Sequence, residues 1–309
     1  MTVFLDFQPI SRTPLFQGLA PMRSILFRDG VFSLRKGAHF LLEVLIFFSV
    51  FVISWLRPFF WALRALGQAV AAEALFRKLT GWWCRTVFKV LGCRVVVEGL
   101  EHLPADSAYV VMSNHQSNYD PILLLGFLDA SLSFIAKSDL FRVPGLAFWL
   151  RYNRCLRLDR GDFRGGADAL AAYGRELKAR RGRVVMFPEG SRTKHPRREI
   201  QRFMGGSLML ALENGLPVVP VALDGTRLAG TRASLVGTPR SGRVIRLRIM
   251  APVMAETNSA AERRRLMKEL RQRMMSNWEA IRVQWPAGGT SPGIRGKAGG
   301  KAGREPHPQ

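Results

Sequence analysis

The sequence predicts an α/β domain, built on a mainly parallel or mixed sheet flanked by helices, that follows an N-terminal membrane-associated helical segment. From Arg94 onward, short β-rich runs alternate with helical stretches, a pattern typical of parallel sheets with helical crossovers. Before this alternation, an almost uncharged apolar stretch begins at Phe40. We therefore divide the chain into a poorly ordered leader (1–38), the membrane-associated helical segment (39–92), the α/β domain (93–285) and a disordered basic tail (286–309).

Composition restricts the classes of function. The chain has 309 residues, 48% of them hydrophobic, which excludes an intrinsically disordered protein. Its net charge of +23 predicts an anionic partner, such as nucleic acid, an anionic bilayer surface or a phosphate-bearing substrate. The three cysteines, Cys84, Cys93 and Cys155, form neither a C-x-x-C pair nor a metal-ligand spacing. We therefore expect a reducing compartment, no disulfide framework and no bound metal.

The apolar stretch determines the expected relation to a membrane. From Phe40 to Leu56 it has 17 positions with one acid, which is at the lower limit for a span of about 20 residues. Beyond it, Trp82 and Trp83 are interleaved with basic residues such as Arg85, as in a helix that lies in the headgroup layer. We expect membrane attachment, by a true span or by interfacial insertion. A buried helix pair in a soluble protein is the alternative.

The α/β domain is predicted element by element. Its strand candidates are apolar, β-branched runs at residues 95–98, 109–112, 132–136, 184–187, 218–221 and 244–249. Helix candidates lie between them at residues 121–128, 165–180 and 207–214. Pro121 suits the first position of a helix, and Asn214 with Gly215 suits a helix end. Farther on, apolar residues at steps of three or four between 261 and 285 predict an amphipathic helix that packs on the domain.

The first candidate functional segment is Asn-His-Gln-Ser-Asn-Tyr-Asp at residues 114–120, an H-x4-D motif. It lies between a predicted strand and a predicted helix, where a rigid scaffold presents loop residues. His115 can remove a proton from an attacking hydroxyl, while Asp120 holds the imidazole in the right tautomer and stabilises the imidazolium. The alternative is structural, because an Asp before Pro121 is also typical of a helix N-cap.

The second candidate segment is Phe-Pro-Glu-Gly-Ser-Arg-Thr at residues 187–193, which follows another predicted strand. It contains a carboxylate, a guanidinium and two hydroxyls in one turn. Arg192 suits bidentate binding of a phosphate, whereas Glu189 would accept from a substrate hydroxyl or position Arg192. The alternative is an ordinary turn with an exposed ion pair, which would contribute little to stability.

Together these segments resemble the glycerolipid acyltransferase family, in particular the bacterial 1-acyl-sn-glycerol-3-phosphate acyltransferases. Two further motifs of that family have counterparts between and after them. Lys137 to Gly145 with Leu158-Asp159-Arg160 resembles its second motif, and Val219-Pro220-Val221-Ala222 resembles its fourth. The four motifs occur in the family's order, at family-like spacings, over about residues 80 to 250.

The resemblance implies a glycerol-3-phosphate acyltransferase-like fold and a division of roles. The enzyme would move an acyl group from acyl-CoA or acyl carrier protein, as a substrate and without a cofactor, to the sn-2 hydroxyl of 1-acyl-glycerol-3-phosphate, which gives phosphatidic acid. His115 would be the general base and Asp120 its orienting partner. The implied acceptor-binding residues are Asn114, Lys137, Arg160, Glu189, Gly190, Ser191 and Arg192. Its partners would be membrane lipids, at the cytoplasmic face of the inner membrane, by integral or monotopic attachment.

One departure from the family keeps two alternatives open. Family members usually carry Phe-Lys-Lys-Gly after the third motif, whereas residues 203–206 are Phe-Met-Gly-Gly. Another lyso-lipid, such as lyso-ornithine lipid, could therefore be the acceptor. The third hypothesis is a non-enzymatic basic protein that binds anionic membranes or nucleic acid. No nucleic-acid-binding motif accompanies the positive charge, so we expect no nucleic acid as a partner.

Overall fold

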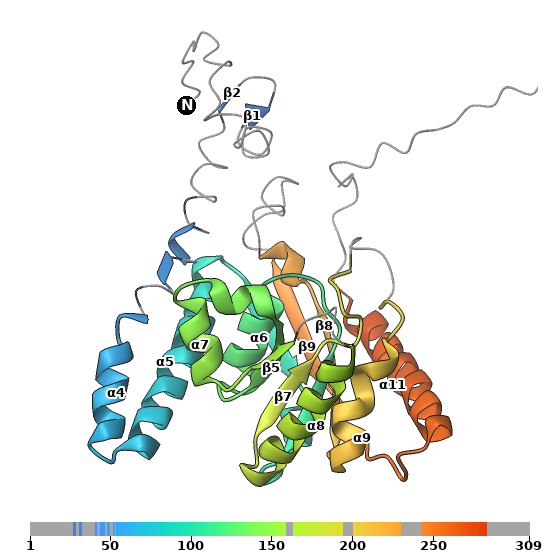
Figure 1. The fold of residues 1–309 in the computed structure, drawn as a ribbon. Coiled ribbons are helices and arrows are strands. Elements are labelled where there is room, and N and C mark those ends of the chain that lie inside the picture. The colour runs from blue at the N-terminus through green and yellow to red at the C-terminus, as the bar shows by residue number, and fades with distance from the viewer. Residues whose placement is uncertain are drawn as a thin grey trace, which may run out of the picture.

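The computed structural model describes residues 54–158, 163–193, 200–229 and 243–282, along with 27–28, 31–32, 41, 44–46, 48–49 and 52 (Figure 1). The short strands β1 (Phe27–Arg28) and β2 (Val31–Phe32) pair antiparallel within the predicted leader, the rest of which lies outside these residues. The predicted tail from residue 286 lies outside them as well.

A seven-stranded mixed sheet forms the centre of the molecule. Its strand order is β3-β9-β8-β4-β7-β5-β6, and only the β8–β9 pair among these neighbours is antiparallel. The strands are β3 (Arg94–Glu98), β4 (Tyr109–Ser113), β5 (Ser133–Lys137), β6 (Leu156–Leu158), β7 (Arg183–Met186), β8 (Val218–Asp224) and β9 (Val244–Ile249). Six of them match predicted strands within a few residues. The sequence did not predict β6, because it is a three-residue edge strand with Arg157 in its middle.

Helices cover both faces of the sheet, so the fold is a three-layer α/β structure, as predicted (Figure 1). Side chains of successive residues in β4 enter opposite cores: Val110 and Met112 pack with α8, α9 and α11, whereas Tyr109 and Val111 pack with α5 and α6. The helices are α4 (Arg57–Ala65), α5 (Ala69–Val90), α6 (Asp120–Phe127), α7 (Leu146–Tyr152), α8 (Phe163–Ala179), α9 (Met209–Asn214) and α11 (Ala260–Ile281). Short 3₁₀ turns lie at Leu100–His102, Ser138–Arg142, Gly205–Leu208 and Thr226–Leu228.

In the segment predicted to associate with a membrane (39–92), α4 and α5 form a helical hairpin, whereas part of the apolar stretch from Phe40 to Leu56 lies outside the described residues. Phe60 and Phe76 pack with α7 in a small separate core, in which the rings of Phe76 and Tyr152 lie 4.0 Å apart. The remaining surface of the hairpin exposes large apolar side chains: Trp61 is 75% exposed and Val70 is 82% exposed. The hairpin is therefore only half buried. None of the described helices combines the length and the apolar composition that crossing a membrane requires.

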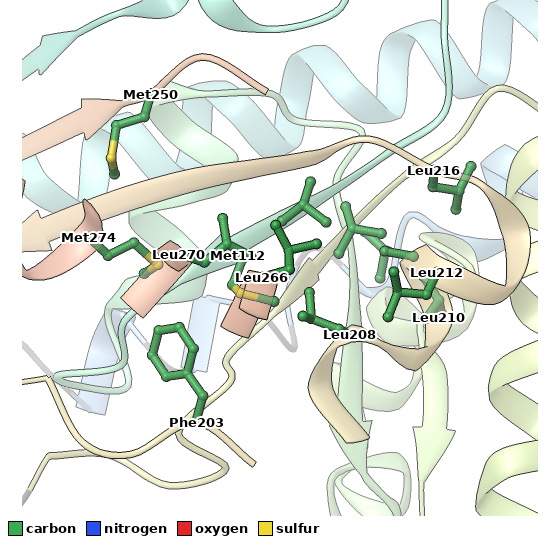
Figure 2. Packing of buried hydrophobic residues seen from close by; sticks show 14 of the residues in the cluster. Met112, Phe203, Leu208, Leu210, Leu212, Leu216, Met250, Leu266, Leu270 and Met274 are labelled. Atoms are coloured by element: carbon green, nitrogen blue, oxygen red, sulfur yellow. The ribbon is translucent and has the colours of Figure 1, made fainter. Parts of the chain in front are cut away.

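The predicted amphipathic helix is α11, and its apolar face is buried as expected. The Ser259 hydroxyl caps its first turn by accepting from the backbone N–H of Glu262 at 3.1 Å. Figure 2 shows its core residues Leu266, Leu270 and Met274 beside Phe203 and the side chains of α9. This cluster closes one face of the sheet.

Gly225 provides a direct test of the packing between β8 and β9. Its φ is +95°, and a Cβ atom there would lie 2.5 Å from the carbonyl oxygen of Val244. Gly225→Ala should lower the free energy of unfolding by about 2 kcal/mol or more, measured by thermal unfolding. Gly205→Ala is the control, because its Cβ would meet no atom within 4 Å. Equal stability of the two variants would contradict the described turn.

Candidate active site

The two candidate segments meet at one edge of the sheet. Strands β4 and β7 are parallel neighbours, with Met112 paired to Met186, and each predicted segment begins just after its strand ends. The carboxyl ends of β8, β5 and β6 lie at the same edge, since these strands run parallel to β4 and β7. The fold therefore brings together loops that are far apart in the sequence, as the carboxyl ends of strands do in other open α/β sheets.

His115 and Asp120 form a hydrogen-bonded pair within the β4–α6 loop. The Nδ1 of His115 lies 2.6 Å from Oδ2 of Asp120, whose side chain is fully buried. The same Oδ2 accepts from the backbone N–H groups of Gln116 at 2.6 Å and Ser117 at 2.9 Å. A carboxylate that accepts from these donors assigns the ring proton to Nδ1, so Nε2 is the nitrogen that can take a proton.

This geometry separates the two interpretations of Asp120. Its carboxylate points back into the loop, and helix α6 begins without a side-chain cap. Asp120 therefore does not act as the N-cap of its own helix. The His115 ring stacks on Phe187 with centroids 4.1 Å apart, and 19% of its side chain is exposed. The imidazole is held on two sides and remains reachable from solvent.

Glu189 lies inside the protein and links three segments. Its Oε1 accepts from the backbone N–H of His115 at 2.8 Å, and its Oε2 accepts from the Thr193 hydroxyl at 3.1 Å and from the backbone N–H of Gln201 at 3.0 Å. Burial raises the pKa of Glu189 above its usual range, and the hydrogen bonds from His115, Gln201 and Thr193 partly oppose that shift. The structure thus shows this carboxylate bonded to protein groups that hold the two loops together.

Two more bonds join the same loops. The backbone N–H of Thr193 donates to the carbonyl oxygen of His115 at 2.8 Å, and Nη1 of Arg192 donates to Oδ1 of Asn118 at 3.0 Å. Arg192 and Ser191 are exposed at the edge of the sheet. Gly190 has a φ of +64°, and a Cβ atom there would lie 2.2 Å from the sulfur of Met204. Gly190 thus lets the turn bend closely beneath the Met204 side chain.

Three further residues were predicted for the site: Asn114, Lys137 and Arg160. Asn114 is buried, and its side-chain amide both donates to and accepts from the backbone of Leu223, at 2.9 Å in each case. It therefore fastens the β4–α6 loop to β8, which is a structural role. Lys137 ends β5, one strand beyond β7, and forms an exposed ion pair with Asp139. Arg160 lies outside the described residues, two positions after the end of β6.

Several residues that support the site were not singled out from the sequence. Gln116 donates from Nε2 to Oδ1 of Asp224 at 2.7 Å, and its Oε1 accepts from the backbone N–H of Gly225 at 3.1 Å. Gln201 reaches Glu189 through its backbone. No sequence signal marked these contacts, because they depend on β8 lying beside β4. Across the described ranges, no three His, Cys, Asp or Glu side chains gather as metal ligands would.

Comparisons with known proteins identify a matching family model and similar sequences. Residues 94–224 match the family model described as Acyltransferase. A 1-acyl-sn-glycerol-3-phosphate acyltransferase from Pseudomonas aeruginosa is 33% identical over 154 residues, which cover 48% of this chain and 58% of that protein. The 1-acyl-sn-glycerol-3-phosphate acyltransferase alpha of Ovis aries is 29% identical over 213 residues, which cover 67% of this chain and 72% of that protein.

A solved structure has a similar fold. It is the crystal structure of the 1-acyl-sn-glycerophosphate (LPA) acyltransferase PlsC from Thermotoga maritima, with 28% sequence identity and a TM-score of 0.61. The match covers 82% of this chain and 99% of that one. The curated relatives are matched over less of their length: the chain spans 58% of the Pseudomonas aeruginosa protein and 37% of a chloroplastic relative from Brassica napus.

Glu189→Gln tests the carboxylate that joins the loops. An amide offers one acceptor oxygen where the carboxylate offers two, so one buried backbone N–H loses its partner. The variant should lower the free energy of unfolding by about 1–3 kcal/mol near neutral pH, measured by denaturant unfolding. The control is Glu213→Gln, a change at an exposed position on α9.

The difference in stability between the wild type and Glu189→Gln should also change with pH, in a direction that the raised pKa determines. Because the folded-state pKa of Glu189 is raised, the folded protein keeps this proton to a higher pH than the unfolded chain. The wild type's advantage over the Gln variant should therefore shrink as the pH rises from about 4.3 through the raised pKa. An advantage that grows over that range would contradict the assignment.

Proposed function

Since residues 94–224 match the acyltransferase family model, we propose that the chain is an enzyme that transfers a fatty acyl group from an acyl thioester to the sn-2 hydroxyl of 1-acyl-glycerol-3-phosphate, giving phosphatidic acid. The observation that carries this proposal is the His115–Asp120 pair at 2.6 Å, held against the 187–193 loop at the carboxyl edge of the sheet. A base and an exposed Arg192 then face the same region.

His115 acts as the general base in a direct transfer, with no covalent acyl-enzyme. Its Nε2 removes the proton of the sn-2 hydroxyl while the hydroxyl oxygen attacks the thioester carbonyl carbon. This attack forms the C–O bond and gives a tetrahedral intermediate, which collapses with cleavage of the C–S bond, and the imidazolium gives its proton to the leaving thiolate. Asp120 stabilises the imidazolium throughout. General-base catalysis of this kind contributes about 10²–10⁴-fold to the rate.

The oxyanion of that intermediate requires hydrogen-bond donors. The loop amides nearest the base are already engaged: the backbone N–H groups of Gln116 and Ser117 donate to Asp120, and that of His115 donates to Glu189. The oxyanion is therefore stabilised by donors other than these three.

The acceptor's phosphate binds to the cations at the same edge. Arg192 is oriented by Asn118 and exposes its guanidinium, whose fork geometry matches phosphate. Lys137 lies two strands from β4, and its ion pair with Asp139 is exposed, so a phosphate can replace the carboxylate at little cost. Arg160, two positions after β6 in the sequence, is a further candidate cation for the phosphate.

The hairpin α4–α5 attaches the enzyme to the cytoplasmic face of the inner membrane, where its substrates reside. Exposed Trp61, Leu66, Val70 and Trp82 provide apolar side chains for insertion at the interface. Each Lys or Arg near anionic lipid adds about 1 kcal/mol. The hairpin packs on α7 and α6, so insertion fixes the orientation of the catalytic domain.

A second acceptor is favoured by one feature, the segment 203–206. Phe203 is buried. Met204, which is 57% exposed above Gly190, and Gly205 occupy the positions where family members usually carry lysines. A less anionic lyso-lipid, such as lyso-ornithine lipid, would fit a site with fewer cations. The reaction and its base would be unchanged.

The proposal is tested with purified protein in lipid vesicles, one labelled acyl-CoA and a panel of lyso-lipid acceptors led by lysophosphatidic acid. We expect phosphatidic acid from the wild type and a loss of about 10³-fold or more in His115→Ala. His102→Ala is the matched control, since the His102 side chain lies away from this site and bonds the carbonyl oxygen of Ile249. If the wild type transfers the acyl group only to another lyso-lipid, the proposed acceptor is wrong and His115 remains the proposed base. Full activity of His115→Ala would refute the mechanism.

Membrane attachment by the hairpin is tested separately. Trp61→Ser combined with Val70→Ser removes two exposed apolar side chains and leaves the buried face of the hairpin intact. Binding to anionic vesicles, measured by sedimentation, should weaken by about tenfold or more. Leu100→Ser, at another exposed apolar position, is the control. Unchanged binding of the double variant would show that the exposed face of the hairpin does not attach the protein to the membrane.

A further inference from the structure

Helix α11 lies beyond the matched residues 94–224, yet two of its polar side chains bond residues that in turn contact the loops of the candidate site. Arg271 and Trp278 are seven positions apart, which places them two turns apart on one face of the helix. Each begins a chain of hydrogen bonds, and both chains end at His115 or its partner Asp120.

The first chain starts at Trp278, whose side chain is 2% exposed. Its indole Nε1 donates to Oδ1 of the buried Asp224 at 3.1 Å, and Nε2 of Gln116 donates to the same oxygen at 2.7 Å. The backbone N–H of Gln116 in turn donates to Oδ2 of Asp120 at 2.6 Å. Trp278 thus fixes the carboxylate that locates Gln116, and Gln116 contributes to the position of Asp120.

The second chain starts at Arg271. Its Nη2 donates to the carbonyl oxygen of Ile200 at 2.8 Å, and its Nε donates to that of Gln201 at 3.2 Å. The backbone N–H of Gln201 donates to Glu189, which accepts from the N–H of His115. Apolar packing supports the same connection, because Ile200 is buried in one cluster with α11. Figure 2 shows Phe203 of this segment beside Leu266 and Leu270.

The two chains constrain different parts of the catalytic loop. Through Glu189, Arg271 restrains the main chain at His115; through Asp224 and Gln116, Trp278 restrains the carboxylate that orients the imidazole. A base is effective only if its nitrogen stays within hydrogen-bond reach of the attacking hydroxyl, and a misplacement of about 1 Å can cost on the order of 10²-fold. Both restraints come from a single rigid helix.

We propose that α11 positions the catalytic base, with Trp278 and Arg271 as positioning residues for the transfer reaction. The inference rests on the proposed function for its kinetic consequences, whereas the hydrogen-bond chains themselves do not depend on the substrate. Neither residue touches the reacting atoms.

The kinetic test uses substitutions that remove a donor and keep most of the packing. Trp278→Phe keeps an aromatic ring and loses the indole N–H, and Arg271→Met keeps an unbranched chain and loses the guanidinium. Each should lower kcat about tenfold and leave KM for lysophosphatidic acid within about twofold. Arg271→Lys, which retains a donor, should restore part of the loss.

Matched controls separate positioning from general packing. Trp149→Phe removes an indole from the other core, and Arg264→Met removes an exposed guanidinium from α11 itself. Both should keep wild-type kcat. Thermal unfolding is measured for all variants. If Trp278→Phe and Arg271→Met lower the melting temperature while kcat stays at the wild-type value, α11 is only structural and the proposal is overturned.

An NMR measurement tests the inference without requiring enzymatic turnover. In protein labelled with ¹⁵N-histidine, the Nδ1 proton shared between His115 and Asp120 is identified by its loss in His115→Ala. We expect that resonance to shift or broaden in Trp278→Phe and to stay in place in Trp149→Phe. An unchanged resonance in Trp278→Phe contradicts positioning. An inactive wild type whose resonance responds as expected would refute the proposed function and uphold the role of α11.

Discussion

The arrangement of the candidate site depends on burying one carboxylate, that of Glu189, among donors from three segments of the chain. A buried charge is costly unless it is fully hydrogen-bonded, and here the donors are two backbone N–H groups and the Thr193 hydroxyl. These bonds fix the main chain at His115 through both of its polar groups, because Glu189 accepts from its N–H and the backbone N–H of Thr193 donates to its carbonyl oxygen. The remaining freedom of the imidazole lies in its side-chain torsions, which Asp120 and the ring of Phe187 restrict.

Around this centre the molecule separates two chemical environments that an amphiphilic substrate needs. Cations follow the carboxyl edge of the sheet, with Arg192 after β7 and Lys137 at the end of β5. Large apolar side chains are exposed on the α4–α5 hairpin, which packs against α6 and α7. The phosphate of a lyso-lipid can thus meet positive charge while the protein contacts the bilayer through the hairpin. The base lies in the loop between β4 and α6, and α6 itself packs on the hairpin.

The parts of this structure that depend on local sequence could be predicted, and those that depend on strand order could not. His115 and Asp120 lie in one turn, so their pairing followed from the spacing and the flanking elements. Asn114 shows the limit: its motif suggested substrate binding, yet its amide is bonded to Leu223, a neighbour only because β8 lies beside β4. The resemblance to a family indicated that residues 187–193 belong beside His115. It could not indicate that Glu189 would be buried, or that Trp278 would reach Asp224.

The measurement that tests the central claim most directly is the release of free thiol from acyl-CoA by the purified protein, followed with and without lysophosphatidic acid. Direct transfer by His115 predicts that thiol release requires the acceptor and equals the phosphatidic acid formed, because the C–S bond breaks only after the acceptor oxygen has added to the carbonyl carbon. A rapid burst of thiol equal to the enzyme concentration in the absence of acceptor would reveal an acyl-enzyme and contradict this account. Thiol release that never depends on the acceptor would contradict it as well.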